Sequence, residues 1–328
     1  MKRVIYVLAA VLLLSTTTGY AQKKGKKAKK EEEKGYVFTA VKDNPATSVK
    51  DQNRSGTCWS YSALSFIESE VLKAGKGEVD LSEMWIVRNA YMEKAERYIR
   101  FHGAATFAEG GAFQDIPYII KKYGIVPEEA YRGLNYGTEL PDFTGLTPAL
   151  EGFVKALANG KVLTPNWKDA LNALLDSYFG PMPEKFTYQG KEYTPKSFAE
   201  STGFNPDDYV NLASFSHQPF YEKFIIEVQD NWRWSTAYNL PIDEFMEVMN
   251  NAIDNGYTIA WGSDVSEAGF TRNGIAVMPD AEKAQELSGS DMARWLKMKP
   301  EEKQLNTKPQ PQKWCTQEER QLAYDNWE

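Results

Sequence analysis

One cysteine in this 328-residue sequence stands in a setting that favours nucleophilic chemistry. Cys58 follows the run DQNRSGT and begins a stretch whose apolar residues recur at helical spacing. At a helix N-terminus the unpaired backbone N–H groups and the helix dipole favour a thiolate over a thiol. A thiolate is the nucleophile of cysteine-based acyl transfer. The spacing therefore predicts Cys58 as a catalytic nucleophile.

Two neighbours of Cys58 fit the same chemistry. Gln52 lies six residues earlier, across a turn that contains Gly56, so its amide N–H groups and the Cys58 backbone N–H are expected to form an oxyanion hole. Trp59 follows directly and is expected to shield the site from water and to contact substrate. A structural cysteine at a helix start is the alternative interpretation. The combination of Gln52, Gly56 and Trp59 around this cysteine favours the active site.

The elements that would position these residues predict an α+β protein whose helices come first. Helical patterns cover residues 58–73, 82–100, 112–123, 147–159, 166–178 and 241–255. Residues 186–193 predict a hairpin that turns at Gln189 and Gly190. Strands are expected over 36–40, 224–228 and 257–261, the last of a buried type, and the tail from Asp280 has a helical pattern.

The segment Ser55–Trp59 resembles the nucleophile signature of the papain-like cysteine peptidases (C1 family), with Ser55 in place of the first cysteine and Thr57 in place of a small residue. The resemblance extends to Leu81–Glu83, to Glu109–Gly111 and to Gly124–Tyr131. It implies that Gly110 and Gly111 pair with the substrate backbone. The family's secreted members have a second cysteine where Ala108 stands. Both cysteines of that disulfide are replaced here.

Within this family the sequence is most similar to the branch of bleomycin hydrolase and bacterial aminopeptidase C. The segments Ser214–Tyr221 and Trp261–Val265 resemble stretches of that branch. The resemblance covers residues 36–328. It implies a papain-like fold, with a helical lobe that carries the cysteine, a β lobe that carries histidine and asparagine, and a large insertion at about 132–250. It also implies a peptide substrate, aminopeptidase-like action, no cofactor or metal, and a possible homo-oligomer.

The catalytic base is not identified among the two histidines. His102 stands before Gly103 and is expected to cap a helix C-terminus. His217 lies 159 residues after Cys58, and Asn231 follows, so spacing alone would suggest a triad. The residues after His217 and Asn231 do not match the family's pattern, which implies that the histidine and asparagine belong beyond Glu328. We therefore expect that the chain is truncated, and that residues 1–328 alone hydrolyse peptides negligibly.

Three functions remain open from the sequence. The first is an exported cysteine peptidase that forms an acyl-enzyme on Cys58. The second is a catalytically incomplete protein or fragment that keeps the peptide-binding strip around Gly110 and Gly111. The third is a thiol-dependent acyltransferase that acts on a non-peptide amide. Substrate assays separate the third from the first.

Charge and composition exclude other classes. The chain has 42% hydrophobic and 13% aromatic residues, which is typical of a folded globular protein. Residues 36–328 contain 29 basic and 42 acidic side chains, so a nucleic-acid partner is not expected. Two Cys and two His are too few for a Cys-rich zinc module.

The first residues predict export. Lys2 and Arg3 precede an apolar run and a Gly-Tyr-Ala end, the pattern of a signal peptide over residues 1–21 that is cleaved after Ala21. Residues 22–35 are a Lys and Glu block without aromatic residues, and a disordered linker is expected there. The peptidase domain would then cover 36–328, in the periplasm or outside the cell, and no membrane span is expected after cleavage.

Overall fold

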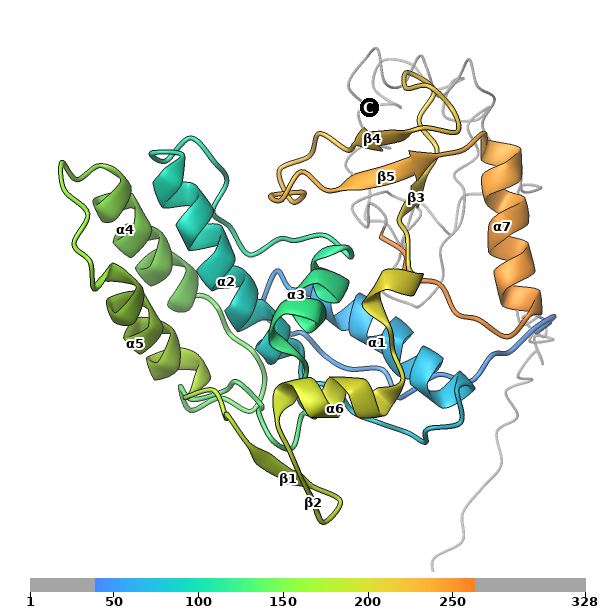
Figure 1. Cartoon of the computed structure of the whole chain (residues 1–328), viewed down its shortest axis with the longest axis horizontal. Helices are drawn as coiled ribbons and strands as arrows, with labels where there is room; N and C mark the ends of the chain where they lie inside the picture. The colour runs from blue at the N-terminus through green and yellow to red at the C-terminus, as the bar shows by residue number, and fades with distance from the viewer. Residues whose placement is uncertain (1–38, 263–328) are drawn as a thin grey trace, which may run out of the picture. The chain divides into compact units, whose positions relative to one another are not determined.

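The computed structural model describes residues 39–262 (Figure 1). The expected signal peptide, linker and C-terminal tail lie outside these residues, as does most of the strand expected over 36–40. The unit that begins at Lys42 contains all the helices and strands given below. In the order of the chain, its helices are α1 (Cys58–Lys73), α2 (Glu83–Arg100), α3 (Asp115–Tyr123), α4 (Leu146–Ala158), α5 (Trp167–Phe179), α6 (Pro195–Thr202) and α7 (Ile242–Asp254), and a 3₁₀ turn, η1, covers Pro206–Asp208.

All six helices expected within residues 39–262 are present, and their ends have local causes. Ser82 caps α2, because its hydroxyl oxygen accepts the Trp85 N–H at 3.1 Å. α3 begins three residues later than expected, at Asp115, whose carboxylate accepts the Ala112 N–H at 3.0 Å. α6 was not expected. Its signal is Thr194, whose side chain forms a capping box with Ser197 ahead of a proline at the first position.

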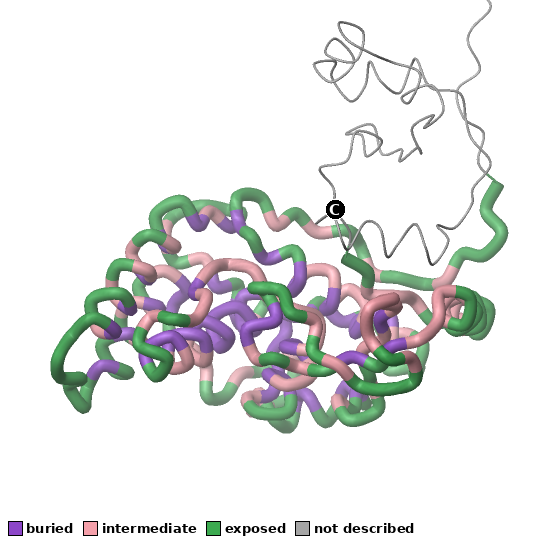
Figure 2. The backbone as a smooth tube through the Cα atoms, turned by 90° about the horizontal axis from the view of Figure 1, so that it is seen from above, coloured by how far each residue is buried: buried purple, intermediate pink, exposed green. Residues whose placement is uncertain are grey.

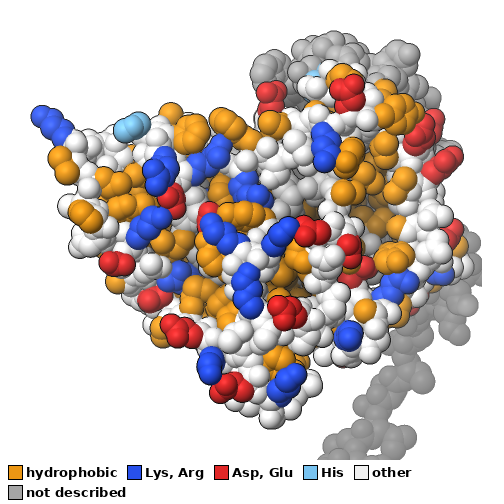
Figure 3. All heavy atoms as spheres, in the orientation of Figure 1, with side chains coloured by type: hydrophobic (Ala, Val, Ile, Leu, Met, Phe, Trp, Pro, Cys, Tyr) orange, Lys and Arg blue, Asp and Glu red, His pale blue; other side chains and the backbone are white. Residues whose placement is uncertain are grey.

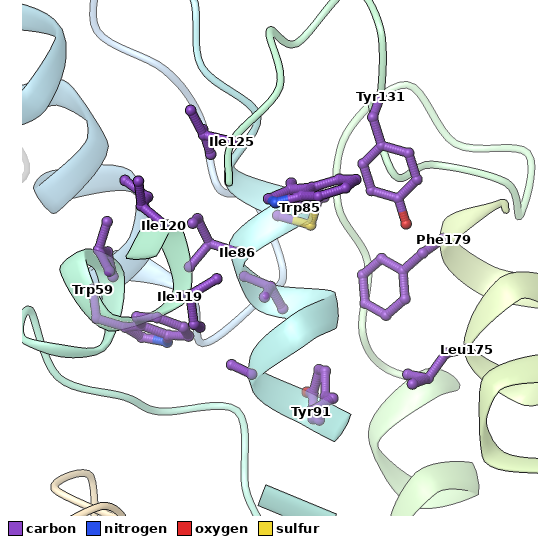
Figure 4. Close-up of a cluster of buried hydrophobic side chains, with 14 of the residues drawn as sticks. Trp59, Trp85, Ile86, Tyr91, Ile119, Ile120, Ile125, Tyr131, Leu175 and Phe179 are labelled. Atoms are coloured by element: carbon purple, nitrogen blue, oxygen red, sulfur yellow. The ribbon is translucent and has the colours of Figure 1, made fainter. Parts of the chain in front are cut away.

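The core lies where α2 packs against α1, α3, α4 and α5. α2 is buried along most of its length, which places Trp85, Ile86 and Tyr91 among side chains of its neighbours (Figure 4). The Tyr91 ring lies 5.8 Å from Phe107 and 6.2 Å from Phe179, measured between ring centroids. Aromatic contacts of this kind add to the area that the rings bury. α2 is therefore the central support on which the nucleophile helix α1 rests.

Gly124 ends α3 in a conformation that only glycine adopts readily. Its φ is 78° and its ψ is −166°, and its carbonyl accepts the Trp85 indole N–H at 3.0 Å. A Cβ atom there would lie 2.3 Å from the Pro195 carbonyl carbon, because α6 packs directly against this turn. Next in the chain, the Ile125 N–H donates to the Pro195 carbonyl at 3.1 Å. This turn ties α2, α3 and α6 together.

Two small sheets form the β structure of residues 39–262. Strands β1 (Phe186–Tyr188) and β2 (Lys191–Tyr193) form the expected antiparallel hairpin, in which Gln189 and Gly190 both have positive φ. The second sheet has the order β3-β5-β4, from the strands β3 (Leu212–Ala213), β4 (Lys223–Ile225) and β5 (Thr236–Asn239). β5 is central: it pairs parallel to β3 and antiparallel to β4.

Asn239 fixes the connection between β3 and β4. Its side chain is fully buried, and its Oδ1 accepts the Phe215 N–H at 2.7 Å. Its Nδ2 donates to the carbonyl oxygens of Phe215 and Gln218, each at 2.9 Å. A side chain on the central strand thus satisfies backbone groups of Phe215 and Gln218 in a partly buried connection.

Two expected strands differ in the structure. Residues 224–228 become the shorter β4, which ends at Ile225. Residues 257–261 form no strand, and Trp261 is 68% exposed, so the prediction of a buried strand there is wrong. No strand in the described range pairs with this segment. Instead, the Tyr257 carbonyl accepts the Asn44 amide at 2.8 Å, and its ring lies under Lys73 Nζ at 4.2 Å.

Burial is uneven between the parts of this unit. Figure 2 shows buried residues concentrated among the helices α1–α5, whereas α7 at the opposite edge buries none of its residues. Figure 3 shows hydrophobic side chains gathered on the surface over β4, β5 and α7, and those with high exposure there include Tyr221, Ile225, Tyr238 and Val248. Among residues 39–262, no helix combines the length and apolar character that crossing a bilayer requires.

Candidate active site

Cys58 is the first residue of α1 and is exposed to solvent as a free thiol. Thr57 precedes it as the N-cap without a capping side-chain hydrogen bond. The Thr57 carbonyl accepts the N–H groups of Ser60 at 2.9 Å and Tyr61 at 3.2 Å, which closes the first turn below the sulfur. An exposed thiol over the positive end of a helix is placed to attack an external carbonyl.

The segment before Cys58 is held by its own hydrogen bonds. Ser55 Oγ donates to the Gln52 carbonyl at 2.8 Å and lies 2.6 Å from Thr57 Oγ1. Both residues are buried, and these hydrogen bonds satisfy their hydroxyl groups. Gln52 Nε2 donates to the Ser55 carbonyl at 2.9 Å. A convergence of the second Gln52 amide hydrogen and the Cys58 N–H on one oxyanion stays a prediction.

Glu109 joins the nucleophile segment to the glycine pair. Its Oε2 accepts the Gly56 N–H at 2.5 Å, and its backbone carbonyl accepts the Trp59 indole N–H at 3.0 Å. Thr147 Oγ1 donates to its other carboxylate oxygen. A Cβ on Gly56 would lie 2.9 Å from Glu109 Cβ, so the close approach requires glycine. Glu109 therefore contacts the segment on both sides of Cys58, through its carboxylate at the Gly56 backbone and through its backbone carbonyl at the Trp59 side chain.

The glycine pair itself lies against the same segment. A Cβ on Gly111 would be 2.7 Å from the Trp59 ring, so the ring lies flush against this backbone. A Cβ on Gly110 would be 2.1 Å from Asp230 Oδ1. The structure thus places the Trp59 ring against Gly111 and the Asp230 carboxylate against Gly110. The contact of Trp59, Gly110 and Gly111 with substrate, and the catalytic roles of Cys58 and Gln52, stay predictions.

Lys94 supports the glycine pair from below, and this role was not expected from the sequence. Its Nζ donates to the carbonyl oxygens of Ala108, at 3.0 Å, and Gly110. The side chain is buried, and burial lowers its pKa to about 8, although the charges of Asp115, Asp230 and Glu109 oppose that shift. The available signal was a lysine within the apolar stripe of a predicted helix.

Asp115 anchors the segment after the glycine pair. The carboxylate is buried and accepts the Trp232 indole N–H at 2.6 Å, while Arg233 lies 3.7 Å away. Burial raises its pKa above the usual range, against the hydrogen bonds and positive charges beside it. The Arg233 guanidinium also stacks over the Tyr118 ring at 3.6 Å from its centroid. These contacts tie residues 231–233 to the start of α3.

The two histidines and Asn231 have identifiable surroundings. His102 is exposed and follows α2 at a positive φ of 51°, close to the expected cap position. The His217 ring lies edge-on to Phe215, at 5.5 Å between centroids, in the β3–β4 connection. Asn231 uses its amide to hold its own loop, through the carbonyls of Ile226 and Ser235. That His217 is not the catalytic base stays a prediction.

A second polar cluster lies at the contact between α1 and α2. Lys50 Nζ is 2.8 Å from Glu68, 2.9 Å from Glu83 and 2.6 Å from Asp80. The carboxylates of Glu68 and Glu83 are buried. Lys50, Asp80 and Glu83, but not Glu68, line a cavity of about 180 Å³, together with Asp51, Tyr61, Met84, Glu128, Arg132, Leu134, Glu139, Leu140 and Pro141. Within residues 39–262, no three His, Cys, Asp or Glu side chains are arranged to hold a metal ion.

The pKa values of two acids in this cluster, Glu83 and Glu128, are raised. Burial raises the pKa of Glu83 to about 7, although Lys50 opposes the shift. Burial, with the charges of Glu83 and Asp80, raises the pKa of Glu128 to about 8. Burial disfavours the charge of Lys50, but Glu83 and Glu68 hold its pKa above the usual range. The cluster therefore carries protons near neutral pH that the unfolded chain releases.

This shift predicts how stability depends on pH. The pKa of Glu128 is about 8 in the folded state and 4.5 ordinarily. Between these two values the folded protein binds more protons than the unfolded chain, so the free energy of unfolding falls as pH rises. The slope reaches about 1.4 kcal/mol per pH unit for one proton. We expect Glu128→Gln to lose less stability than wild type between about pH 5 and 7.5. Urea unfolding at several pH values measures this.

The control for that comparison is Glu192→Gln, which removes an exposed carboxylate on β2. It should leave the pH dependence of the wild type unchanged, because an exposed surface ion pair contributes little. Identical pH slopes for Glu128→Gln and wild type would contradict the assignment of the shifted proton to Glu128.

The sequence is similar to known proteins over part of its length. A model of the Peptidase C1-like family matches residues 8–141. Aminopeptidase C of Lactobacillus delbrueckii subsp. lactis is 24% identical over 70% of this chain and 61% of its own length. Aminopeptidase C of Streptococcus thermophilus is also 24% identical, over 74% of this chain and 64% of its own length. The chain therefore spans less than two thirds of these relatives.

A yeast relative and a solved structure extend the comparison. Cysteine proteinase 1, mitochondrial, of Saccharomyces cerevisiae is 28% identical over 31% of this chain and 25% of its own length. The crystal structure of PepW from Lactobacillus rhamnosis HN001 has a TM-score of 0.57 at 18% identity, and the match covers 79% of this chain and 69% of that chain. The similarity in structure concerns the fold. Residues 8–141 are therefore similar in sequence to the Peptidase C1-like family, and the part of the chain that the structure describes has a fold similar to that of PepW.

Proposed function

We propose that the protein is a cysteine peptidase that hydrolyses peptide bonds through an acyl-enzyme on Cys58. The observation that carries the proposal is the exposed Cys58 thiol at the start of α1, beside a glycine pair whose backbone is fixed by Trp59. The thiolate would attack the peptide carbonyl, the amine would leave with a proton, and water would then hydrolyse the thioester. Gln52 would donate to the developing oxyanion.

Aminopeptidase-like action is the finer part of this proposal. Two relatives named aminopeptidase C support it, and the chain covers about three fifths of their length. The N-terminal run that begins with Lys2 and Arg3 supports export, so the peptides would lie outside the cytoplasm. The proposal includes a homo-oligomer, which is supported only by the resemblance to the bleomycin hydrolase branch.

Binding of peptides without hydrolysis is the second candidate. Lys94 and Trp59 fix the backbone of Gly110 and Gly111 without any contribution from a catalytic base. The strip could therefore bind an extended peptide even where no base acts on Cys58. Turnover of an aminoacyl amide separates the two candidates.

Selective alkylation of Cys58 tests the nucleophile. We expect iodoacetamide to label Cys58 several-fold faster than Cys315, because Cys58 is exposed at a helix N-terminus. Cys315 lies outside the described residues, in a polar stretch of the sequence. Mass spectrometry of peptides after timed labelling measures both rates in one sample. A Cys58 that reacts no faster than Cys315 in the folded protein would remove the nucleophile assignment.

A further inference from the structure

Asp230 places a carboxylate directly against the glycine pair. A Cβ on Gly110 would lie 2.1 Å from Asp230 Oδ1 and 2.7 Å from Oδ2, so both oxygens lie close to this backbone. Asp230 is exposed to solvent, and it precedes the buried Asn231 and Trp232. The strip that would bind a peptide backbone therefore has a negative charge beside it.

The turn that carries Asp230 is fixed by the residue after it. Asn231 Oδ1 accepts the Gln114 amide at 3.1 Å and the Ser235 N–H at 2.9 Å. Asn231 Nδ2 donates to the carbonyls of Ile226, at 3.0 Å, and Ser235, at 2.8 Å. The buried amide thus has partners on both its oxygen and its nitrogen, and Gln114 connects it to the residues that precede α3. Asp230 is consequently held at one place rather than carried on a mobile loop.

The charges of three carboxylates act on the buried Lys94 ammonium, and these carboxylates differ in their hydrogen-bond partners. Glu109 accepts hydrogen bonds from Gly56 and Thr147. Asp115 accepts the Trp232 indole N–H and faces Arg233. Within residues 39–262, no hydrogen bond or ion pair engages the carboxylate of Asp230. One exposed carboxylate is therefore available at the strip, in a neighbourhood where negative charges outnumber positive ones.

We propose that Asp230 is a specificity-determining residue that binds a cationic nitrogen of a peptide lying along Gly110 and Gly111. Two sources present such a nitrogen: the terminal ammonium group of the peptide, and a lysine or arginine side chain. A carboxylate accepts charge-assisted hydrogen bonds from either of them. The inference rests on the proposed function, because it takes the glycine pair as the place where substrate lies.

The test is a series of peptidyl chloromethyl ketones of one, two and three residues, each with a free or an acetylated N-terminus. The Cys58 thiolate forms a thioether with each of them and releases chloride, so the rate reports binding near Cys58 without requiring turnover. At one length we expect the free amine to react about fivefold faster at low salt, the upper range for an exposed ion pair. High salt should reduce this ratio. Acetylated probes with lysine or norleucine test the side-chain source.

The variant Asp230→Asn should abolish the preference for the cationic probe. Glu227→Gln, an exposed change three residues upstream, is the matched control and should keep it. If Asp230→Asn loses the preference for a free over an acetylated N-terminus, Asp230 binds the terminal ammonium group. If it loses a preference for lysine over norleucine, Asp230 binds the side chain. Equal rates for cationic and neutral probes in wild type, or a preference that survives in Asp230→Asn, would overturn the inference. Failure of the proposed function would appear differently, as slow labelling of Cys58 by iodoacetamide in every variant.

Discussion

Replacing Cys58 with alanine is expected to lower kcat/KM for an aminoacyl amide by at least about a thousandfold, because removal of a catalytic nucleophile leaves only binding and oxyanion stabilisation. The exposed thiol at the start of α1 has no substitute, since the sequence holds only one other cysteine, Cys315. The measurement is the hydrolysis of a fluorogenic aminoacyl amide by the protein as the cell makes it, because negligible hydrolysis is expected of residues 1–328 by themselves. Cys315→Ala is the matched control and should retain the wild-type rate.

Equal turnover by Cys58→Ala and wild type would disprove the assignment. The same assay tests whether either of the two histidines in this sequence, His102 or His217, is the catalytic base. We expect His102→Ala and His217→Ala to keep turnover within about threefold of wild type, since a base would cost far more. If His217→Ala loses as much as Cys58→Ala, then His217 is the base and our interpretation of its sequence context is wrong.

Gly124→Ala is expected to cost about 3–5 kcal/mol of unfolding free energy. The residue has φ 78° and ψ −166°, a region that residues with a Cβ avoid at a cost of about 1–3 kcal/mol. The new Cβ would also lie 2.3 Å from the Pro195 carbonyl carbon and oxygen, so the backbone of α6 would have to move. Urea denaturation followed by circular dichroism measures the difference.

Gly152→Ala is the matched control for that experiment. Gly152 is exposed within α4, and a Cβ there meets nothing within 4 Å. We expect this variant to gain about 0.5–1 kcal/mol, because alanine loses less backbone freedom than glycine when a helix forms. If Gly124→Ala changes stability by less than about 1 kcal/mol, the close approach of Pro195 does not constrain the fold.

Local sequence signals explain most of the helices and the hairpin that were predicted. Ser82 has the side chain that caps α2, and Gln189 with Gly190 can adopt the positive φ of a tight hairpin. Tyr257–Trp261 shows the limit of such signals. Its apolar pattern fits a strand, but a strand also needs a partner, and the pattern of one segment does not supply that information.

In the candidate site, too, local features could be predicted from the sequence and contacts between distant segments could not. Gln52, Cys58 and Trp59 are close in sequence, so their spacing alone indicates a shared role. Glu109 and Lys94 act through contacts with residues 14–53 positions away. Such contacts depend on how α1, α2 and the intervening segments pack, which one sequence does not reveal. The contacts of Trp232 and Asp115, 117 residues apart, were not foreseen for the same reason.

The hold of Asn239 on the β3–β4 connection has a consequence for local unfolding. A backbone amide that donates to a buried side chain can exchange its hydrogen with solvent only when that hydrogen bond breaks. Because the Phe215 N–H donates to Asn239, which belongs to β5, the Phe215 amide and the β5 amides should become exposed in one opening event. In native-state hydrogen exchange, residues 212–225 and 236–240 should therefore form a single cooperative unit. Asn239→Ala would divide it, and the segment that carries His217 would open independently of the strands on either side.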